Sequence, residues 1–246
     1  MMETLIIKYG GSFVMPDKTY NLDSLEELKR LVLRFPKKRF VFVIGGGKLA
    51  RNITKVSESI LDDALEGNTF LKGLAFDELG IAVTKINGRF VLEWLKTNLG
   101  NDVVFEDIVD YPLNVPSTSK RVIIATGYKP GVSTDYDMML LAKAYGASKV
   151  FKISNFPMVL DVKPENFKKE LINSYKPIKN ISWAGMKDLV GESFIAGGNY
   201  PLDPPSTRLG NELHKINHDF KLYIGQKEEL IKMILDDEFV GTIVSG

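Results

Sequence analysis

The sequence predicts an α/β protein, a three-layer α/β/α sandwich around a mainly parallel sheet of about eight strands. Short runs rich in Val, Ile and Phe alternate with longer segments whose apolar residues recur at helical spacing, and this alternation is typical of βαβ units. The chain has 246 residues, long enough to bury a substantial core as one large α/β domain or two small ones. Several of the short runs end in glycine-rich turns, the position at which open α/β sheets bind ligands.

The first half of the chain is expected to alternate strands and helices. Asn21, Asp23 and Ser24 are residues that start helices, and apolar residues follow them at intervals of three or four. The run 40–44 is apolar on both faces, as in a central parallel strand. The expected strands are 4–8, 39–44, 103–105 and 121–125, and the expected helices are 25–32, 48–61, 70–99 and 135–145.

The second half continues the alternation with a weaker signal after Asn155. The expected strands are 149–153, 221–224 and 241–244, the expected helices are 182–189, 207–216 and 226–235, and loops or turns are expected at 161–164 and 201–205. No internal repeat or low-complexity linker divides the sequence. We therefore expect a single domain, 1–246, in which a change of character near Lys149 separates a lobe at 1–148 from a lobe at 149–246.

The balance of charges and the amino-acid composition exclude some classes of partner and site. Lys and Arg number 32 and Asp and Glu number 31, so the net charge is +1, whereas proteins that bind nucleic acid carry a basic excess. The chain has no cysteine, which excludes disulfides, thiolate zinc sites and cysteine nucleophiles. No signal-peptide pattern is visible, and the apolar runs are shorter than the roughly 20 residues of a membrane helix. We expect a cytoplasmic protein with no nucleic-acid or membrane partner.

Three strands lead directly into glycine-rich turns that carry cations or hydroxyl groups. Lys8, Lys48 and Arg51 accompany the first two turns. Glycine lets backbone N–H groups approach a ligand closely, and a following helix N-terminus adds partial positive charge. Three such turns at one edge of a sheet predict a site that binds phosphate groups. The three segments are 5–12, 40–51 and 122–135.

The middle turn fits one familiar motif and fails another. Residues 45–50 satisfy the dinucleotide fingerprint G-x-G-x-x-A between a strand and a helix, so an NAD enzyme is an alternative that depends on this segment alone. A P-loop would need glycine at Phe42 and a hydroxyl at Leu49, and it has neither. His214 and His218 are four residues apart on an expected helix, but a lysine stands where a zinc motif has glutamate, so we interpret them as surface residues.

The third turn combines an open backbone with hydroxyl groups. Gly127 and Gly131 open the backbone, and Ser133 and Thr134 offer hydroxyls. Capping of the next helix by Thr134 or Asp135 is the simple structural interpretation. It accounts for one of these residues but not for the clustering of the glycines and both hydroxyls.

Taken together, segments 8–12, 45–51 and 131–135 resemble the amino acid kinase superfamily, and within it the uridylate (UMP) kinase branch, especially the archaeal type. The same order continues at 77–87, 140–142, 146–147, 152–155, 202–204 and 241–244, so the resemblance covers essentially the whole chain. It implies that 1–148 binds the acceptor nucleotide and 149–246 binds ATP. The implied reaction is transfer of the ATP γ-phosphoryl group to a nucleoside monophosphate, UMP to UDP, in pyrimidine metabolism. A homo-oligomer, a hexamer, is also implied.

The resemblance assigns roles to individual residues. Lys8 and Lys152 would flank the transferring phosphoryl group, and Asp135 would support Lys8 or lie beside Mg²⁺. Mg²⁺ and ATP, the phosphoryl donor, are the implied cofactors, and no side chain is assigned as a metal ligand. The implied acceptor-binding residues are Gly45, Gly46, Arg51, Asp77, Thr126, Ser133 and Thr134. The implied ATP-binding residues are Gly10, Gly11, Ser12, Asn155, Phe156, Asp161 and Pro164.

Residues 156–164 depart from the pattern of the family, in which this segment lines the adenine and ribose pocket. Pro157 and Met158 replace an acid and a glycine, Leu160 replaces a tyrosine, and Lys163 replaces the second acid of a turn. Proline removes a backbone donor and restricts the residue before it, so a stiffer and more apolar loop is expected. This departure motivates one alternative, a non-catalytic oligomer that binds nucleotides or anions. A related kinase of the same superfamily with another small acidic acceptor is a separate alternative. The isopentenyl phosphate type would need a histidine beside the triple glycine, which is absent.

Overall fold

A sheet of eight strands forms the middle of the protein, in a computed structural model that describes residues 2–17, 19–65, 68–193 and 200–246. Neighbouring strands run parallel except β9 and β10, which are antiparallel, so the prediction of a mainly parallel sheet is confirmed. In spatial order the strands are β3 (Val104–Val109), β4 (Val122–Ala125), β2 (Lys38–Ile44), β1 (Glu3–Tyr9), β5 (Lys149–Ile153), β9 (Lys221–Gly225), β10 (Gly241–Ser245) and β8 (Asn180–Ser182).

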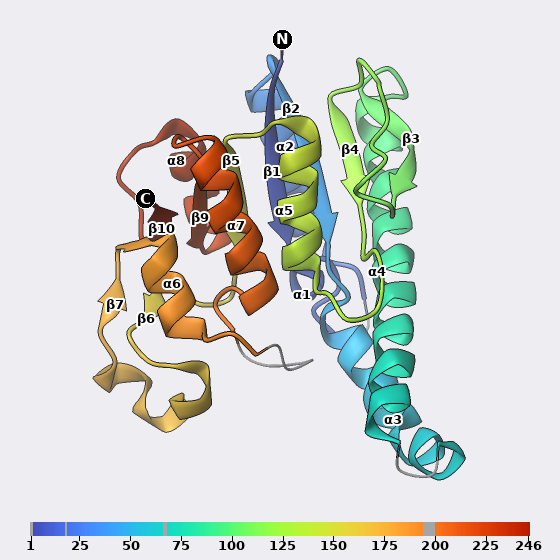
Figure 1. Cartoon of the computed structure of the whole chain (residues 1–246). Helices are drawn as coiled ribbons and strands as arrows, with labels where there is room; N and C mark the ends of the chain where they lie inside the picture. Colours follow the sequence, from blue (N-terminus) through green and yellow to red (C-terminus); the bar gives the residue numbers. More distant parts are fainter. Residues whose placement is uncertain (1, 18, 66–67, 194–199) are drawn as a thin grey trace.

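Helices cover both faces of the sheet and complete the predicted three layers (Figure 1). Side chains alternate between the faces along each strand, so Ile6 of β1 joins one core while Leu5 and Ile7 join the other. Lys8 consequently points to the same face as Ile6. That face packs against α5 (Thr134–Tyr145), α6 (Trp183–Val190) and α7 (Pro204–Ile216), and the opposite face packs against α2 (Leu22–Arg34), α4 (Thr69–Leu99) and α8 (Leu230–Leu235).

Two helices extend beyond the sheet. α3 (Gly47–Ala64) and the first half of α4 lie side by side and project away from the body of the protein (Figure 1). Where they adjoin the sheet, these helices border the turns that follow β1 and β2. Across the residues that the structure describes, no helix is both long enough and apolar enough to cross a membrane.

The helix starts beside the third glycine turn differ from the prediction. Ser133, and not Thr134 or Asp135, caps α5, because its hydroxyl accepts hydrogen bonds from the backbone N–H groups of Asp135 and Tyr136. α7 begins at Pro204, inside the segment expected to be a turn. Its cap is Asp203, and proline is well suited to the first helical position.

Several short elements have no signal in the sequence. α1 (Gly11–Val14) is a single turn after β1, and β8 has three residues. The expected loop at 161–164 follows β6 (Val159–Leu160), which pairs with β7 (Pro177–Ile178) in a separate small sheet. The expected helix at 226–235 is divided between η3 (Lys227–Glu229) and α8. Two further short helices follow β6, namely η1 (Pro164–Asn166) and η2 (Lys169–Ser174).

Candidate active site

Two lysines on neighbouring strands share one carboxylate. Lys8 of β1 and Lys152 of β5 are register partners in the sheet, and Asp135 lies above them in the first turn of α5. The Asp135 Oδ1 atom lies 2.7 Å from Lys8 Nζ, and its Oδ2 atom lies 2.6 Å from Lys152 Nζ. The structure thus brings together all three residues that the resemblance assigned as catalytic.

Burial and mutual ion pairing shift the pKa values of Asp135 and Lys152. Burial raises the pKa of Asp135, but the positive charges of Lys152 and Lys8 more than offset that effect and hold the pKa at about 2. Burial also lowers the pKa of Lys152, while its ion pair with Asp135 opposes the change. Asp135 is therefore ionised at neutral pH and lies between the Nζ atoms of the two lysines. Such an arrangement can bind anionic oxygen atoms through charge-assisted hydrogen bonds.

The glycine turns after β1 and β2 touch through their backbones. A Cβ atom on Gly11 would lie 2.1 Å from the carbonyl oxygen of Gly45. Gly47 has a φ of +65°, and a Cβ atom there would lie 2.4 Å from the carbonyl carbon of Gly11. Only glycine fits at these two positions. Because β1 and β2 are parallel neighbours, both turns lie at the edge of the sheet that carries Lys8 and Lys152.

A cavity of about 280 Å³ lies between the turns that follow β2 and β4 and the helices α3, α4 and α5. Four predicted acceptor-binding residues line it, namely Gly46, Arg51, Asp77 and Thr134. The Asp77 carboxylate accepts a hydrogen bond of 2.7 Å from the backbone N–H of Gly131. Arg51 Nη2 lies 3.4 Å from the hydroxyl of Ser12, which was predicted on the ATP side.

The other three predicted acceptor residues do not line this cavity. The carbonyl oxygen of Gly45 accepts a hydrogen bond of 3.0 Å from the side chain of Asn87. Thr126 is buried beneath α4, where its methyl group would lie 2.4 Å from a Cβ on Gly88. Ser133 caps α5 and donates a hydrogen bond to Asp203. These three residues therefore contact other parts of the protein and not the cavity.

Sequence reasoning missed polar residues that hold this site. Asn87 of α4 also donates to the carbonyl oxygen of Gly46, and Thr84 accepts a hydrogen bond of 2.8 Å from the N–H of Gly127. Asp203 joins the starts of α5 and α7, and the Asp-Pro sequence is a cap signal that could have identified it. Asp137 lines the cavity and is buried. Its only sequence signal is a second carboxylate in the first turn of α5.

The predicted ATP-binding residues do not line one common cavity, unlike four of the predicted acceptor-binding residues. Gly10, Gly11 and Ser12 lie in the turn and helix after β1. Asn155 is exposed, and its carbonyl oxygen accepts a hydrogen bond of 3.5 Å from Gln226. Phe156 lines a small apolar cavity of about 110 Å³, which Asp161 and Pro164 do not line. The remaining lining residues are Met158, Val159, Leu160, Val162, Phe167, Ile172 and Pro201.

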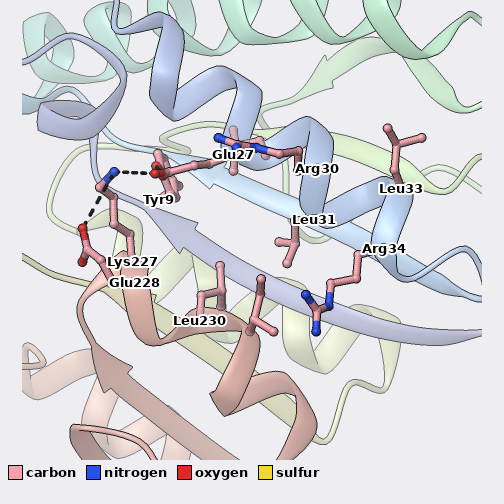
Figure 2. Close-up of a pocket in the computed structure, with 11 residues that line it drawn as sticks. Tyr9, Glu27, Arg30, Leu31, Leu33, Arg34, Lys227, Glu228 and Leu230 are labelled. Atoms are coloured by element: carbon pink, nitrogen blue, oxygen red, sulfur yellow. Dashed lines mark hydrogen bonds and ion pairs between the residues drawn. The ribbon is translucent and has the colours of Figure 1, made fainter.

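A larger cavity, of about 690 Å³, lies away from this cluster, on the face that carries α2 and α8. Figure 2 shows residues of α2 on one side of it and Lys227, Glu228 and Leu230 on the other. The Glu27 carboxylate accepts hydrogen bonds from Lys227 Nζ at 2.6 Å and from the Tyr9 hydroxyl at 3.3 Å. None of its lining residues is a glycine, and only Tyr9, the last residue of β1, adjoins a glycine turn. The smaller cavity beside Arg51 and Asp77 is therefore the better candidate site.

The described part of the chain holds no group of three or more His, Asp or Glu side chains that could bind a metal ion. Both oxygen atoms of Asp135 are engaged by lysines. His214 and His218 lie edge to face with ring centroids 5.5 Å apart, and His214 Nδ1 lies 3.3 Å from the carbonyl oxygen of Phe220. They do not belong to this site.

Comparison with known proteins identifies the family. The uridylate kinase of Methanocorpusculum labreanum is 26% identical over 250 residues, covering 100% of this chain and 97% of that relative. The uridylate kinase of Thermoplasma volcanium is 26% identical over 207 residues, covering 82% of each chain. The solved uridylate kinase of Archaeoglobus fulgidus has the same fold, with a TM-score of 0.72 at 20% identity over 98% of this chain and 99% of that one. The sequence model described as "Amino acid kinase family" matches residues 3–216, and the chain therefore belongs to the amino acid kinase family.

Proposed function

We propose that this protein is a phosphotransferase that moves the γ-phosphoryl group of ATP to a nucleoside monophosphate, with UMP as acceptor and UDP as product. The observation that carries the proposal is the placement of Lys8 and Lys152 on one buried carboxylate, at the edge where the glycine turns meet. The similarity to uridylate kinases along the whole chain supports the choice of acceptor.

The two cavities have positions that suit a transfer between two nucleotides. Thr134 lines the 280 Å³ cavity and is followed directly by Asp135. Phe156 lines the 110 Å³ cavity and follows β5, the strand that carries Lys152. We assign the first cavity to the acceptor and the region of the second to ATP, which corresponds to the lobes 1–148 and 149–246. The acceptor phosphate would be bound by Arg51 and Thr134, and the ribose by Asp77.

In this proposal the reaction needs charge neutralisation and positioning more than a nucleophilic side chain. The acceptor phosphate is already ionised near neutral pH, so it attacks without a general base. A new bond forms between an oxygen of the UMP phosphate and the γ-phosphorus, and the bond from that phosphorus to the β–γ bridging oxygen breaks to release ADP. Lys8 and Lys152 bind the oxygens on which negative charge moves, and Asp135 fixes their positions. Mg²⁺ enters with ATP as part of the substrate.

A second candidate function is binding of nucleotides without catalysis. The observation that favours it is the apolar lining of the cavity beside Phe156 and Met158. Pro157 and Met158 stand there in place of the acid and the glycine of the family pattern. An assay of ADP release with UMP, CMP, AMP and GMP as acceptors, beside calorimetric titrations of UMP, ATP and NAD, separates the candidates. ADP release with UMP supports the kinase. Binding of UMP and ATP without ADP release identifies a binding protein, and tight binding of NAD alone supports the dinucleotide alternative.

The proposal includes the setting of the reaction. We place it in pyrimidine metabolism in the cytoplasm, with the protein acting as a homo-oligomer, a hexamer. Sedimentation velocity at several protein concentrations tests the assembly, and a monomer at all of them contradicts it.

A further inference from the structure

One buried acid in the candidate acceptor cavity has an oxygen atom without a partner. Asp137 lies in the first turn of α5, is 1% exposed, and lines the cavity together with Arg51, Asp77 and Thr134. Its Oδ2 atom accepts a hydrogen bond of 3.2 Å from the backbone N–H of Tyr128. Its Oδ1 atom is buried and has no hydrogen-bond partner among the described residues. A buried polar atom of this kind calls for an explanation, and a ligand in the cavity supplies one.

The surroundings of Asp137 favour its neutral form. Burial raises the pKa of Asp137, and the carboxylates of Asp203 and Asp135 raise it further, to about 8, against the lowering effects of the Tyr128 N–H and of Lys8. Asp135 belongs to α5, Asp203 precedes α7, Tyr128 lies in the turn after β4, and Lys8 belongs to β1. Across the cavity, α3 contributes Arg51 and α4 contributes Asp77.

A neutral Asp137 has one place for its proton. Since Oδ2 accepts the hydrogen bond from the Tyr128 N–H, the proton lies on Oδ1 and makes this atom a donor. This atom has no hydrogen-bond partner among the described residues. An ionised Asp137, by contrast, would repel a phosphate group in the same cavity.

We propose that Asp137 is a specificity-determining residue of the acceptor cavity, where its Oδ1–H group donates a hydrogen bond to an oxygen atom of the bound nucleoside monophosphate. This inference rests on the proposed function. It selects acceptors that present a hydrogen-bond acceptor at this position, and it makes acceptor binding depend on the protonation of one side chain.

The pH dependence of UMP binding tests the inference. The second ionisation of a phosphate monoester lies near pH 6, so the phosphate group of UMP keeps its charge above about pH 7. Tyr128, whose N–H group donates to Asp137, also keeps its phenol proton up to pH 9. Burial and, to a lesser extent, the neighbouring Tyr111 raise the pKa of this phenol above its ordinary value. If only neutral Asp137 binds, calorimetric titration should show the UMP affinity falling about tenfold between pH 7 and pH 9.

Two variants and one control separate this role from a structural one. Asp137→Asn keeps the bond to the Tyr128 N–H and offers an uncharged amide donor, so UMP affinity should be retained and vary less than twofold between pH 7 and pH 9. Asp137→Ala loses the donor, and UMP binding should weaken at least about tenfold at pH 7. Asp102→Asn changes a fully exposed carboxylate that does not line the cavity and should keep the wild-type pH dependence.

The results that overturn the inference are distinct from those that overturn the proposed function. A wild-type UMP affinity that is constant from pH 7 to pH 9, or an unchanged pH dependence in Asp137→Asn, refutes the role of Asp137 but leaves UMP phosphorylation standing. Failure of the wild-type protein to bind UMP at any pH removes both. If the variants do not fold, infrared difference spectra of the wild-type protein decide. A protonated-carboxyl band that shifts on addition of UMP supports the inference, and its absence rejects it.

Discussion

Lys8 and Lys152 stand side by side on adjacent parallel strands, and the carboxylate of Asp135 lies within 2.7 Å of one ammonium nitrogen and within 2.6 Å of the other. Like charges on neighbouring strands repel, so this pair depends on the shared anion. Two basic side chains and one carboxylate thus meet at the edge of the sheet where the glycine turns lie, and this excess of basic groups suits the binding of phosphate.

Replacement of Lys8 by alanine should reduce turnover far more than acceptor binding. Its charge is most useful when negative charge moves between oxygen atoms, and removal of such a preorganised donor typically costs about 10²–10³ in rate. Steady-state kinetics with UMP and ATP, beside calorimetry with UMP, measure the two effects. Lys38→Ala is the control, because Lys38 pairs with Glu3 at the other end of the sheet. Turnover of Lys8→Ala within a few-fold of the parent would contradict the assignment.

Asp135→Asn should destabilise the protein by about 3–5 kcal/mol, because it leaves the buried Lys152 without its counter-ion. Urea unfolding at neutral pH measures this loss. The sign of the pH dependence follows from the lowered pKa of about 2. The contribution of Asp135 is fully present above the unfolded value near 4 and is lost as the pH falls through 2. The variant should therefore show a shallower decline of stability in acid than the parent, and an equally steep decline would contradict this account.

Arg51→Ala and Asp77→Asn should each raise the apparent KM for UMP and leave ATP binding nearly unchanged, since both side chains line the proposed acceptor cavity. Calorimetric titration with each nucleotide checks this prediction. Lys48→Ala is a matched control, because Lys48 also lies near the start of α3 but pairs with Asp17 and does not line the cavity. Unaltered UMP affinity in both variants would show that the acceptor binds elsewhere.

Gly47→Ala should be much more harmful than Gly131→Ala. Both glycines have a positive φ, +65° and +81°, so both substitutions carry the cost of about 1–2 kcal/mol for a left-handed residue. Only at Gly47 would the new Cβ also collide with backbone, at 2.4 Å from the carbonyl carbon of Gly11, whereas Gly131 faces open space. Thermal unfolding of both variants measures the difference. Equal losses would mean that the two glycine turns do not need their close contact.

The sequence was most informative where local chemistry decides the structure. The strand 149–153 is found at its predicted position, and the three glycine turns do gather at one edge, because parallel strands place their carboxyl ends together. The parts that were missed depend on contacts between distant segments. The side chain of Asn87 donates a hydrogen bond to the carbonyl oxygen of Gly45, which is 42 residues away in the sequence. The antiparallel direction of β10 is likewise seen only in its pairing with β9. Three residues of β8 carry too little pattern to predict a strand.

The altered loop at 156–164 gives the last prediction. Phe156 and Met158 line an apolar cavity, and immediately after them the N–H of Val159 donates a hydrogen bond of 2.9 Å to the buried hydroxyl of Thr242. Pro157 and Met158 therefore lie directly before a residue whose backbone is held in place by this hydrogen bond. Proline at 157 stiffens this short connection and supplies no N–H group to a nucleotide. We expect weak ATP binding by the parent protein and ordinary UMP binding.

Restoring the family's residues at 157 and 158 should strengthen ATP binding and leave UMP binding unchanged. The double variant Pro157→Asp with Met158→Gly should tighten ATP binding in calorimetric titrations with Mg²⁺, while UMP affinity stays the same because neither residue lines the acceptor cavity. Met158→Gly alone is the matched control, since it opens the loop without adding the acid. If the parent already binds ATP tightly and the double variant binds it no better, the loop does not limit ATP binding. The pocket for adenine is then formed by the neighbouring residues, and the substitutions at 157 and 158 only change how Phe156 packs.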